Sequence, residues 1–141
     1  MVQDNERHRL IKNQSGWSVG VDIEDVAKFR TALRPSSRFV SRTFSESEIE
    51  YCMSKGEPAV HFAGTFAAKE ALYKAVNRLS DDVVKLTDFQ ISHDKKGRPA
   101  VSYVGTEHEP GTLDMKVSLS HTSDYAVAVA LVMPKDWLRS G

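Results

Sequence analysis

The residues best placed for chemistry are the carboxylate of Glu70 and the ammonium groups of Lys69 and Lys74. All three lie within residues 62–75, FAGTFAAKEALYKA. In a helix, with about 100° per residue, alanine and aromatic side chains would cover nearly all of this segment's surface. Such a helix runs through the middle of a protein, where an unpaired ion costs several kcal/mol. One interpretation pairs Glu70 with Lys74, an i,i+4 contact worth about 0.2–0.5 kcal/mol. The apolar setting also favours a second interpretation, in which Glu70 belongs to a reactive site.

A second group of carboxylates follows a predicted strand. Four apolar residues alternate along this strand: Trp17, Val19, Val21 and Ile23. Asp22 and Glu24 therefore lie on the opposite face of the strand. Asp25 is placed to begin a helix over residues 26–33, as its cap or first-turn acid. Capping or solvation remains the alternative role for Asp22 and Glu24.

A divalent cation would explain these carboxylates together. Two like charges 4 Å apart repel by about 4 kcal/mol at an effective dielectric near 20, so Asp22 and Glu70 need a counter-ion to meet. Mg²⁺, with Mn²⁺ as an alternative, binds one or two carboxylates and completes its shell with water and substrate phosphates. We therefore predict that Asp22 and Glu70 form a metal site that binds the phosphate groups of a substrate.

A third segment predicts a hairpin near the C-terminus. Residues 115–121 form its first strand, residues 122–124 its turn, and residues 125–132 a second strand that is apolar on both faces. Such a strand lies at the centre of a sheet or in a subunit interface. His121, at the hairpin corner, is either a structural hydrogen-bonding residue or part of a site. The echo of Leu119-Ser120-His121 in residues 91–93 is assigned no role.

The remaining elements indicate an α+β domain. Ser45 and Glu48 form a capping box that begins a helix through Met53. After the long helix, residues 89–93 and 100–103 predict a second hairpin around a 95–97 turn. The order is a strand, two or three helices and then antiparallel strands, which is typical of helices packed on one side of a sheet.

Composition limits the class of protein. The chain has 141 residues, 19 basic and 19 acidic, and one cysteine, Cys52, expected to be a small apolar filler. Balanced charge disfavours nucleic acid or an anionic membrane as a partner, and the lone cysteine suits a reducing, cytoplasmic location. We expect a polar, partly disordered extension over residues 1–16, without a signal peptide or membrane span, a domain over residues 17–135 and a tail over residues 136–141.

Five blocks, in order over residues 17–132, resemble the signatures of the 4′-phosphopantetheinyl transferases, most closely the short holo-acyl-carrier-protein synthase type. They are residues 20–23 (GVDI), 42–52 (RTFSESEIEYC), 66–71 (FAAKEA) with Lys74, 96–99 (KGRP), and 117–121 (VSLSH) with Tyr125 and Ala126. The resemblance implies a fold with a long central helix packed on an antiparallel sheet. It also implies a Mg²⁺-dependent reaction that moves phosphopantetheine from coenzyme A to a serine of an acyl or peptidyl carrier protein, releasing adenosine 3′,5′-bisphosphate.

The resemblance also implies roles for single residues. Asp22 and Glu70 match the metal ligands, and Glu24 would add an oxygen directly or through water. Glu70, or a metal-bound water that it orients, would accept the serine proton, and Lys74 would neutralise charge on the transferred phosphoryl group. Residues assigned to coenzyme A are Lys69 or His121 for its phosphates, with Thr122 beside His121, and Arg98 with Pro99 for its adenine. Thr65 stands where many relatives carry arginine, so one phosphate contact is weakened or rerouted.

Partners follow from charge and from the resemblance. Five basic residues and no acidic ones lie within residues 26–44: Lys28, Arg30, Arg34, Arg38 and Arg42. We expect this block to dock an acidic carrier protein. We also expect a homotrimer with coenzyme A bound between subunits, since residues 125–132 present two apolar faces.

Three alternatives remain open. Another Mg²⁺-dependent phosphate enzyme, such as a nucleotide hydrolase, is disfavoured because no Gly-rich phosphate loop is present. A non-catalytic module that binds carrier proteins would not need Asp22, Glu70 and Lys74. A domain excised from a larger synthase fits the sequence as well as a stand-alone enzyme does, and the pathway served (fatty acid, polyketide or peptide) is left open.

Overall fold

A computed structural model describes residues 16–34, 37–80, 83–106 and 113–135. The predicted 136–141 tail and all of the predicted extension except Gly16 lie outside the described residues. Within those residues, no helix is long and apolar enough to cross a membrane.

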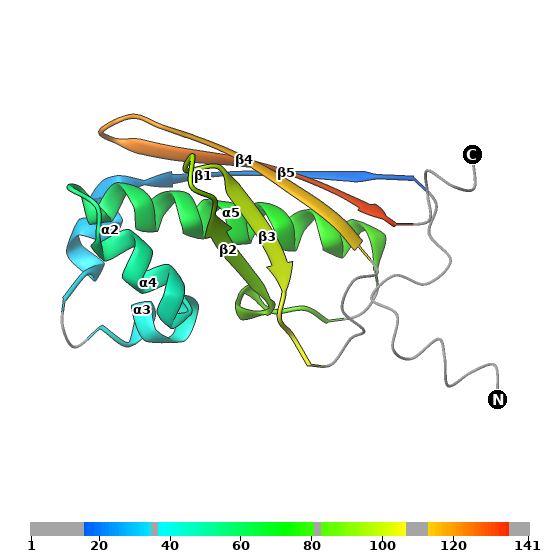
Figure 1. Cartoon of the computed structure of the whole chain (residues 1–141), viewed down its shortest axis with the longest axis horizontal. Coiled ribbons are helices and arrows are strands. Elements are labelled where there is room, and N and C mark those ends of the chain that lie inside the picture. The colour runs from blue at the N-terminus through cyan, green and yellow to red at the C-terminus, as the bar shows by residue number, and fades with distance from the viewer. Residues whose placement is uncertain (1–15, 35–36, 81–82, 107–112, 136–141) are drawn as a thin grey trace.

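The structure confirms the α+β class. A long helix, α5 (Pro58–Leu79), lies against a three-stranded antiparallel sheet, with three short helices at one end of the molecule (Figure 1). The other elements are β1 (Ser18–Asp25), α2 (Val26–Ala32), α3 (Arg38–Thr43), α4 (Glu46–Met53), the 3-10 helix η1 (Leu86–Asp88), β2 (Phe89–His93), β3 (Pro99–Tyr103), β4 (Leu113–His121) and β5 (Tyr125–Pro134). Both predicted hairpins are present, as β2–β3 and β4–β5.

Strand β5 is central, as its two apolar faces predicted. The sheet order is β1-β5-β4, and β2 and β3 form a separate two-stranded sheet. On the face of β5 that packs against α5, small side chains are fully buried: Ala126, Ala128 and Ala130. Asp22 pairs with Ala128 and Glu24 with Ala126, so both carboxylates share this face with the helix.

The opposite face of this sheet is apolar and exposed. Its large side chains include Trp17, Val19, Val21 and Ile23 on the β1 side, and Tyr125 and Val129 on β5. Ile23 alone keeps 63% of its surface accessible. We call these six residues the outer apolar face. A contiguous face of this kind on a single chain indicates a binding surface.

Helix α5 is buried along most of its length, as predicted, and extends beyond both ends of residues 62–75. Pro58 occupies its first turn, where a missing N–H has no cost. Its alanine row lets β1 approach closely: a Cβ on Gly20 would overlap the carbonyl oxygen of Ala71 and lie 3.1 Å from the nitrogen of Ala75. Strand and helix therefore meet backbone to backbone at Gly20.

A buried ion pair joins α4, α5 and β2. The predicted capping box is present at Ser45, and the same Glu48 carboxylate accepts the N–H of Ile91 at 2.8 Å. Lys69 Nζ lies 2.9 Å from Glu48 Oε1 and donates to the Phe89 carbonyl at 2.6 Å. Both charged side chains are 1% exposed, so each depends on the other.

The start of α2 differs in one detail from the prediction. Asp25 occupies the N-cap position, but its side chain makes no capping hydrogen bond. The N–H of Val26 instead donates to the carbonyl of Asp124 at 2.8 Å. The β4–β5 turn therefore satisfies one of the free N–H groups at the α2 N-terminus, while the Asp25 side chain caps none of them.

The contact at Gly20 gives a stability prediction. Gly20→Ala should lower the free energy of unfolding by about 1–3 kcal/mol, because the new methyl group must push β1 away from α5. Gly56→Ala is the matched control, since a Cβ there meets nothing within 4 Å. Chemical denaturation of the three proteins measures the difference. Equal stability of the two variants would show that β1 does not press on α5 at this point.

Candidate active site

Asp22, Glu24, Glu70 and Lys74 gather on one flank of α5. Lys74 Nζ lies 3.1 Å from Asp22 Oδ1 and donates to the Val21 carbonyl at 3.1 Å. Lys74 is thus paired with β1, across the strand–helix contact that Gly20 makes possible. The structure brings together the strand carboxylates and the helix residues that the sequence placed 46 or more positions apart.

The carboxylates of this flank repel one another. Partial burial, and then the carboxylate of Asp22 beside it, raise the pKa of Glu24 to about 7, while Lys28 opposes the shift. Burial and the charge of Asp22 likewise raise the pKa of Glu70, against Lys74 and Lys28. A cation placed here would relieve this repulsion.

The donor set fits a cation that brings its own additional ligands. Asp22 Oδ2 is buried and has no hydrogen-bond partner among the described residues. Within the same residues, no group of three or more His, Cys, Asp or Glu side chains could hold a metal ion. Glu24, predicted as a further ligand, is 3.6 Å from Lys28 in an ion pair. Asp22 and Glu70 would thus supply two oxygens, and water and phosphate the others.

His121 lies on the opposite flank of α5, within a cluster that the sequence did not reveal. Its ring centre is 5.9 Å from that of His61. Tyr51 stacks on His93 with ring centres 3.8 Å apart and an angle of 5°, and Lys55 Nζ lies 4.5 Å from the centre of the Tyr51 ring. We call these five residues the imidazole cluster. The echo of residues 119–121 in residues 91–93 was assigned no role, and no spacing in the sequence links His93 to His121.

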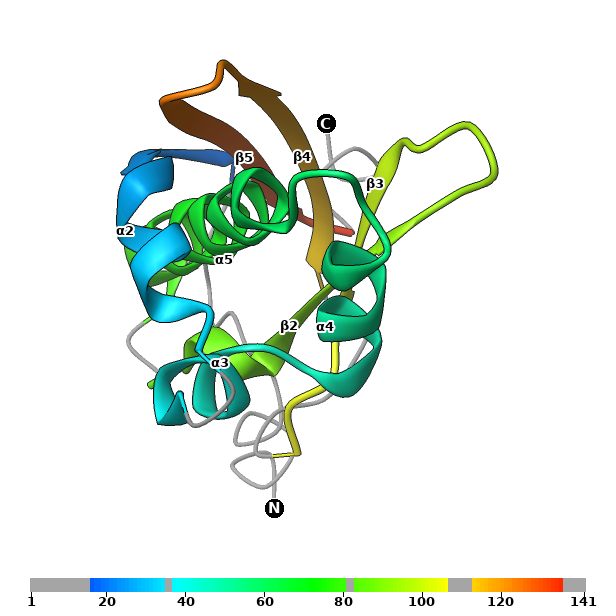
Figure 2. The same cartoon turned by 90° about the vertical axis from the view of Figure 1, so that its left-hand side faces the viewer.

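Helix α5 separates these two flanks. Figure 2 looks along the helix and shows β1 and α2 beside one flank, and β4 and α4 beside the other. Gly20 of β1 touches the helix at Ala71 and Ala75. On the other side, Leu119 of β4 packs against Gly64 of α5, 3.2 Å from the position that a Cβ would occupy there. The carboxylates and the imidazole cluster of one chain therefore belong to opposite sides of the same helix.

Two residues predicted to bind coenzyme A have other roles in the structure. Lys69 is not available to a phosphate, because its ammonium is buried against Glu48 and two carbonyl groups. Thr122 Oγ1 accepts the N–H groups of Asp124 and Tyr125 at 3.2 and 3.1 Å, so it holds the β4–β5 turn. The pattern of apolar residues in the sequence predicts which faces are buried, but it does not predict hydrogen bonds or ion pairs. It therefore could not reveal the ion pair of Lys69 or the turn contacts of Thr122.

Thr65 and Cys52 form a buried contact. The Thr65 hydroxyl lies 3.6 Å from Cys52 Sγ, in the interior between α4 and α5. Burial raises the pKa of the Cys52 thiol to about 11, so the thiol stays protonated at neutral pH, as expected of a filler. Thr65 therefore points to the core.

Arg98 and Pro99 lie at the β2–β3 turn. Arg98 Nε is 2.6 Å from Asp94 Oδ2, and hydrogen bonds from the backbone and side chain of Arg98 lower the pKa of Asp94. Pro99 is half-buried and pairs with His93. This places the predicted adenine contacts next to the imidazole cluster.

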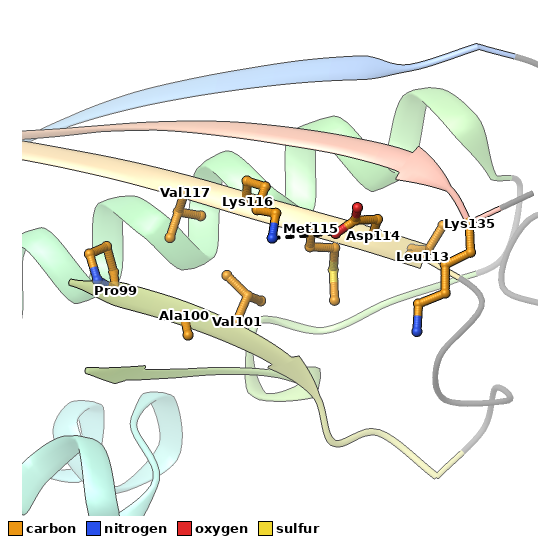
Figure 3. A pocket seen from close by; sticks show the side chains of 9 residues that line it. All are labelled: Pro99, Ala100, Val101, Leu113, Asp114, Met115, Lys116, Val117 and Lys135. Atoms are coloured by element: carbon orange, nitrogen blue, oxygen red, sulfur yellow. Dashed lines mark ion pairs between the residues drawn. The ribbon is translucent and has the colours of Figure 1, made fainter. Parts of the chain in front are cut away.

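A cleft of about 280 Å³ opens between β3 and β4 (Figure 3). Pro99 and Val101 line one wall and Met115 and Val117 the other, with Lys135 at the end nearer Leu113. Pro99 is the only residue assigned to coenzyme A that lines this cleft. The cleft is therefore distinct from the carboxylate flank.

The five basic residues predicted to dock a carrier protein are all exposed. Lys28 and Arg30 lie on α2, which follows the carboxylate strand directly, and Arg38 and Arg42 lie on α3. Arg30 donates to the Ser123 carbonyl at 3.3 Å, which ties α2 to the β4–β5 turn. A basic surface thus begins beside Glu24.

The comparisons with known proteins agree with this geometry. The sequence pattern of the 4′-phosphopantetheinyl transferase superfamily matches residues 18–130. The chain is 38% identical over 115 residues to a holo-[acyl-carrier-protein] synthase of Chlorobium limicola, covering 81% of this chain and 91% of that protein. It is 37% identical over 119 residues to one of Thermoanaerobacter sp., covering 82% and 86%.

Solved structures show the same fold. An ACPS–coenzyme A complex of Chronobacterium ammoniagenes matches with a TM-score of 0.71 and 29% identity, covering 86% of this chain and 99% of that one. The holo-[acyl-carrier-protein] synthase of Helicobacter pylori in complex with coenzyme A matches with a TM-score of 0.65 and 27% identity, covering 81% and 98%. The chain therefore belongs to the 4′-phosphopantetheinyl transferase superfamily, in its holo-[acyl-carrier-protein] synthase branch.

Proposed function

We propose that this enzyme transfers the 4′-phosphopantetheine arm of coenzyme A to a serine of an apo acyl or peptidyl carrier protein, with Mg²⁺. The observation that carries the proposal is the group formed by Asp22, Glu70 and Lys74, in which a buried Asp22 oxygen has no partner among the described residues. The relatives named above as holo-[acyl-carrier-protein] synthases, and those solved with coenzyme A, support the choice of both substrates.

Each residue of this group has a defined task. Asp22 and Glu70 would hold Mg²⁺, or Mn²⁺ in its place, and the cation would supply positive charge to offset that of the phosphate groups. Glu70, with its raised pKa, accepts the serine proton directly or through a water that it orients. The serine oxygen bonds to the β-phosphorus, the bond to the bridging pyrophosphate oxygen breaks, and adenosine 3′,5′-bisphosphate leaves. Lys74 neutralises the charge that develops on the transferred phosphoryl group.

The separation of the two flanks supports an assembly in which neighbouring copies share coenzyme A. Strand β4, which ends at His121, and the β2–β3 hairpin lie across α5 from β1, which carries Asp22 (Figure 2). A second copy could present its imidazole cluster to the carboxylate flank of the first. The outer apolar face gives such copies a surface to bury. We therefore propose a homotrimer, the closed cyclic arrangement expected from the resemblance.

The mass of the carrier protein, measured by mass spectrometry, tests the transfer. Incubation with coenzyme A, Mg²⁺ and an apo acyl carrier protein should add the mass of phosphopantetheine to the carrier. Glu70→Gln should reduce this transfer at least about 100-fold, because it removes a charge from the metal site with little change of volume. Glu46→Gln, on the exposed side of α4, is the control. Near-normal turnover of Glu70→Gln at saturating Mg²⁺ would refute the metal assignment.

Light scattering tests the assembly. The wild-type protein should have the mass of a trimer at micromolar concentration, and Val21→Glu should dissociate it by placing a charge on the outer apolar face. Val21 is 56% exposed in one chain, so the fold should persist. Val104→Glu, at an exposed position off the three-stranded sheet, should remain trimeric. A monomeric wild-type protein would contradict the shared site.

Carrier docking is tested by charge reversal. Arg34→Glu or Arg30→Glu should raise KM for the carrier protein and leave the affinity for coenzyme A unchanged, because opposite charges chiefly accelerate encounter. Transfer by the wild-type protein should also weaken as salt shortens the Debye length from about 10 Å at 0.1 M. Arg78→Glu, in the last turn of α5, makes the same change of charge at the end of the helix away from α2 and α3 (Figure 1). Carrier kinetics that respond neither to these arginines nor to salt would place docking on another surface.

A further inference from the structure

The cleft between β3 and β4 lies where the two sheets meet without pairing. Within the described residues, β4 pairs with β5 and β3 pairs with β2, so the two strands belong to different sheets. Figure 3 shows them on either side of the cleft. Each is therefore an edge strand on the side that faces the cleft, and an edge strand presents backbone N–H and C=O groups to whatever lies beside it.

The walls of the cleft belong to the margin of the main core. Val101 of β3, and Met115 and Val117 of β4, pack against the buried cluster around α5, but each keeps part of its surface exposed. The cleft measures about 280 Å³, against about 150 Å³ for an apolar protein cavity that binds benzene. An aromatic side chain with two fused rings would therefore fit, and it would remove apolar surface of these three residues from water.

The C-terminal tail, residues 136–141 (DWLRSG), continues from one end of this cleft. Strand β5 ends at Pro134, which pairs with Leu113, and the next residue, Lys135, lines the cleft (Figure 3). The tail itself lies outside the described residues. Because two residues of chain span at most about 7 Å, Trp137 is within reach of the cleft.

Trp137 suits the cleft by size and by chemistry. A tryptophan ring buries about 150–250 Å² of surface, and its indole N–H needs an acceptor when it is buried. Asp114 lines the cleft, and its contact with Lys116, at 3.9 Å, is long for an ion pair, so its carboxylate can accept this N–H. Lys116 and Lys135 supply ammonium groups of the kind that pack over an indole face.

The segment before Gly16, which carries Leu10 and Ile11, is the competing occupant from the same chain. It leads into β1, and β5 separates β1 from β4 in the sheet. It would therefore have to cross two strand spacings, about 10 Å, to reach the cleft. The tail already begins there, so the tail is the favoured occupant.

We propose that Trp137 of the C-terminal tail inserts into the cleft of its own chain and closes the seam between the two sheets. The indole packs between Val101 and Met115, and the tail holds β3 against β4. Glu48 already anchors β2, but a two-stranded sheet is only marginally stable by itself, so the clamp secures its second strand. The tail lies beyond residues 18–130, which match the superfamily, and its role here is independent of the proposed reaction.

Tryptophan fluorescence tests the insertion, because the chain has two tryptophans, Trp17 and Trp137. Trp17→Phe leaves Trp137 as the sole emitter and keeps an aromatic ring on the outer apolar face. We expect Trp137 to emit at shorter wavelength in the folded protein than in denaturant, and acrylamide to quench it several-fold less than free tryptophan. Emission and quenching equal to those of the denatured chain would overturn the proposal.

A charge on the cleft wall tests the place of insertion. Met115→Glu, made in the Trp17→Phe protein, should shift the Trp137 emission to longer wavelength and restore most of the quenching, because it buries a carboxylate beside the indole. Met53→Glu makes the same change on α4, where Met53 is 57% exposed, and should leave the emission unchanged. Protection that survives Met115→Glu would show that the tail packs on another surface.

Two further measurements keep this test decisive. If Met115→Glu does not fold, nuclear Overhauser contacts between the Trp137 indole and the Met115 methyl group of the wild-type protein support the insertion, and their absence overturns it. Val21→Glu, expected to be monomeric, shows whose tail fills the cleft. Protection of Trp137 retained in that variant supports insertion into the same chain, whereas its loss there would assign the cleft to the tail of a neighbouring copy.

Hydrogen exchange tests the clamp. In Trp137→Ala, the β3 amide hydrogens that bond to β2 should exchange several-fold faster than in the wild-type protein, while those of α5 keep their rates. Arg139→Ala, in the same tail, is the control and should exchange as the wild type does. Equal exchange of β3 in all three proteins would show that the hairpin does not depend on Trp137.

Discussion

The backbone contact between β1 and α5 at Gly20 is the constraint on which the rest of the structure depends. No side chain fits between strand and helix there, so the helix surface must be small and apolar beneath the sheet. Ionised groups can then emerge only along the flanks of α5. Asp22, one pleat beyond Gly20, meets Lys74 at 3.1 Å for this reason. The same contact that stabilises the core therefore brings together the side chains to which we assign the phosphate chemistry.

That arrangement also divides the site. The sheet holds β1 and β4 on either side of β5, and α5 covers β5, so one chain cannot bring its carboxylates to its own imidazole cluster. The buried pair of Glu48 and Lys69 fixes α4 and β2 to the far flank, which keeps Tyr51 and His93 in place. The outer apolar face is exposed in one chain and is the surface on which the proposed second copy would pack. The fold and the arrangement of these side chains thus follow from one close backbone contact, and the proposed assembly is consistent with it.

Sequence reasoning succeeded where periodicity or local chemistry carried the information. The capping box at Ser45, the two hairpins and the central position of β5 are confirmed, because each depends on neighbouring residues or on a face pattern. It did not predict the buried ion pair of Lys69 with Glu48, because the two residues lie 21 positions apart in sequence. The imidazole cluster was missed because its members come from separate elements and share no spacing.

Mixing two inactive variants tests the division of the site most directly. Glu70→Gln protomers lack the carboxylate flank and His121→Ala protomers lack part of the imidazole cluster, so each assembly alone should transfer poorly. When the two are unfolded, mixed and refolded together, about a quarter of the interfaces in a cyclic trimer should join an intact flank to an intact cluster. The account predicts that transfer to the carrier recovers in the mixture. A mixture no more active than its parents would show that each chain carries a complete site of its own.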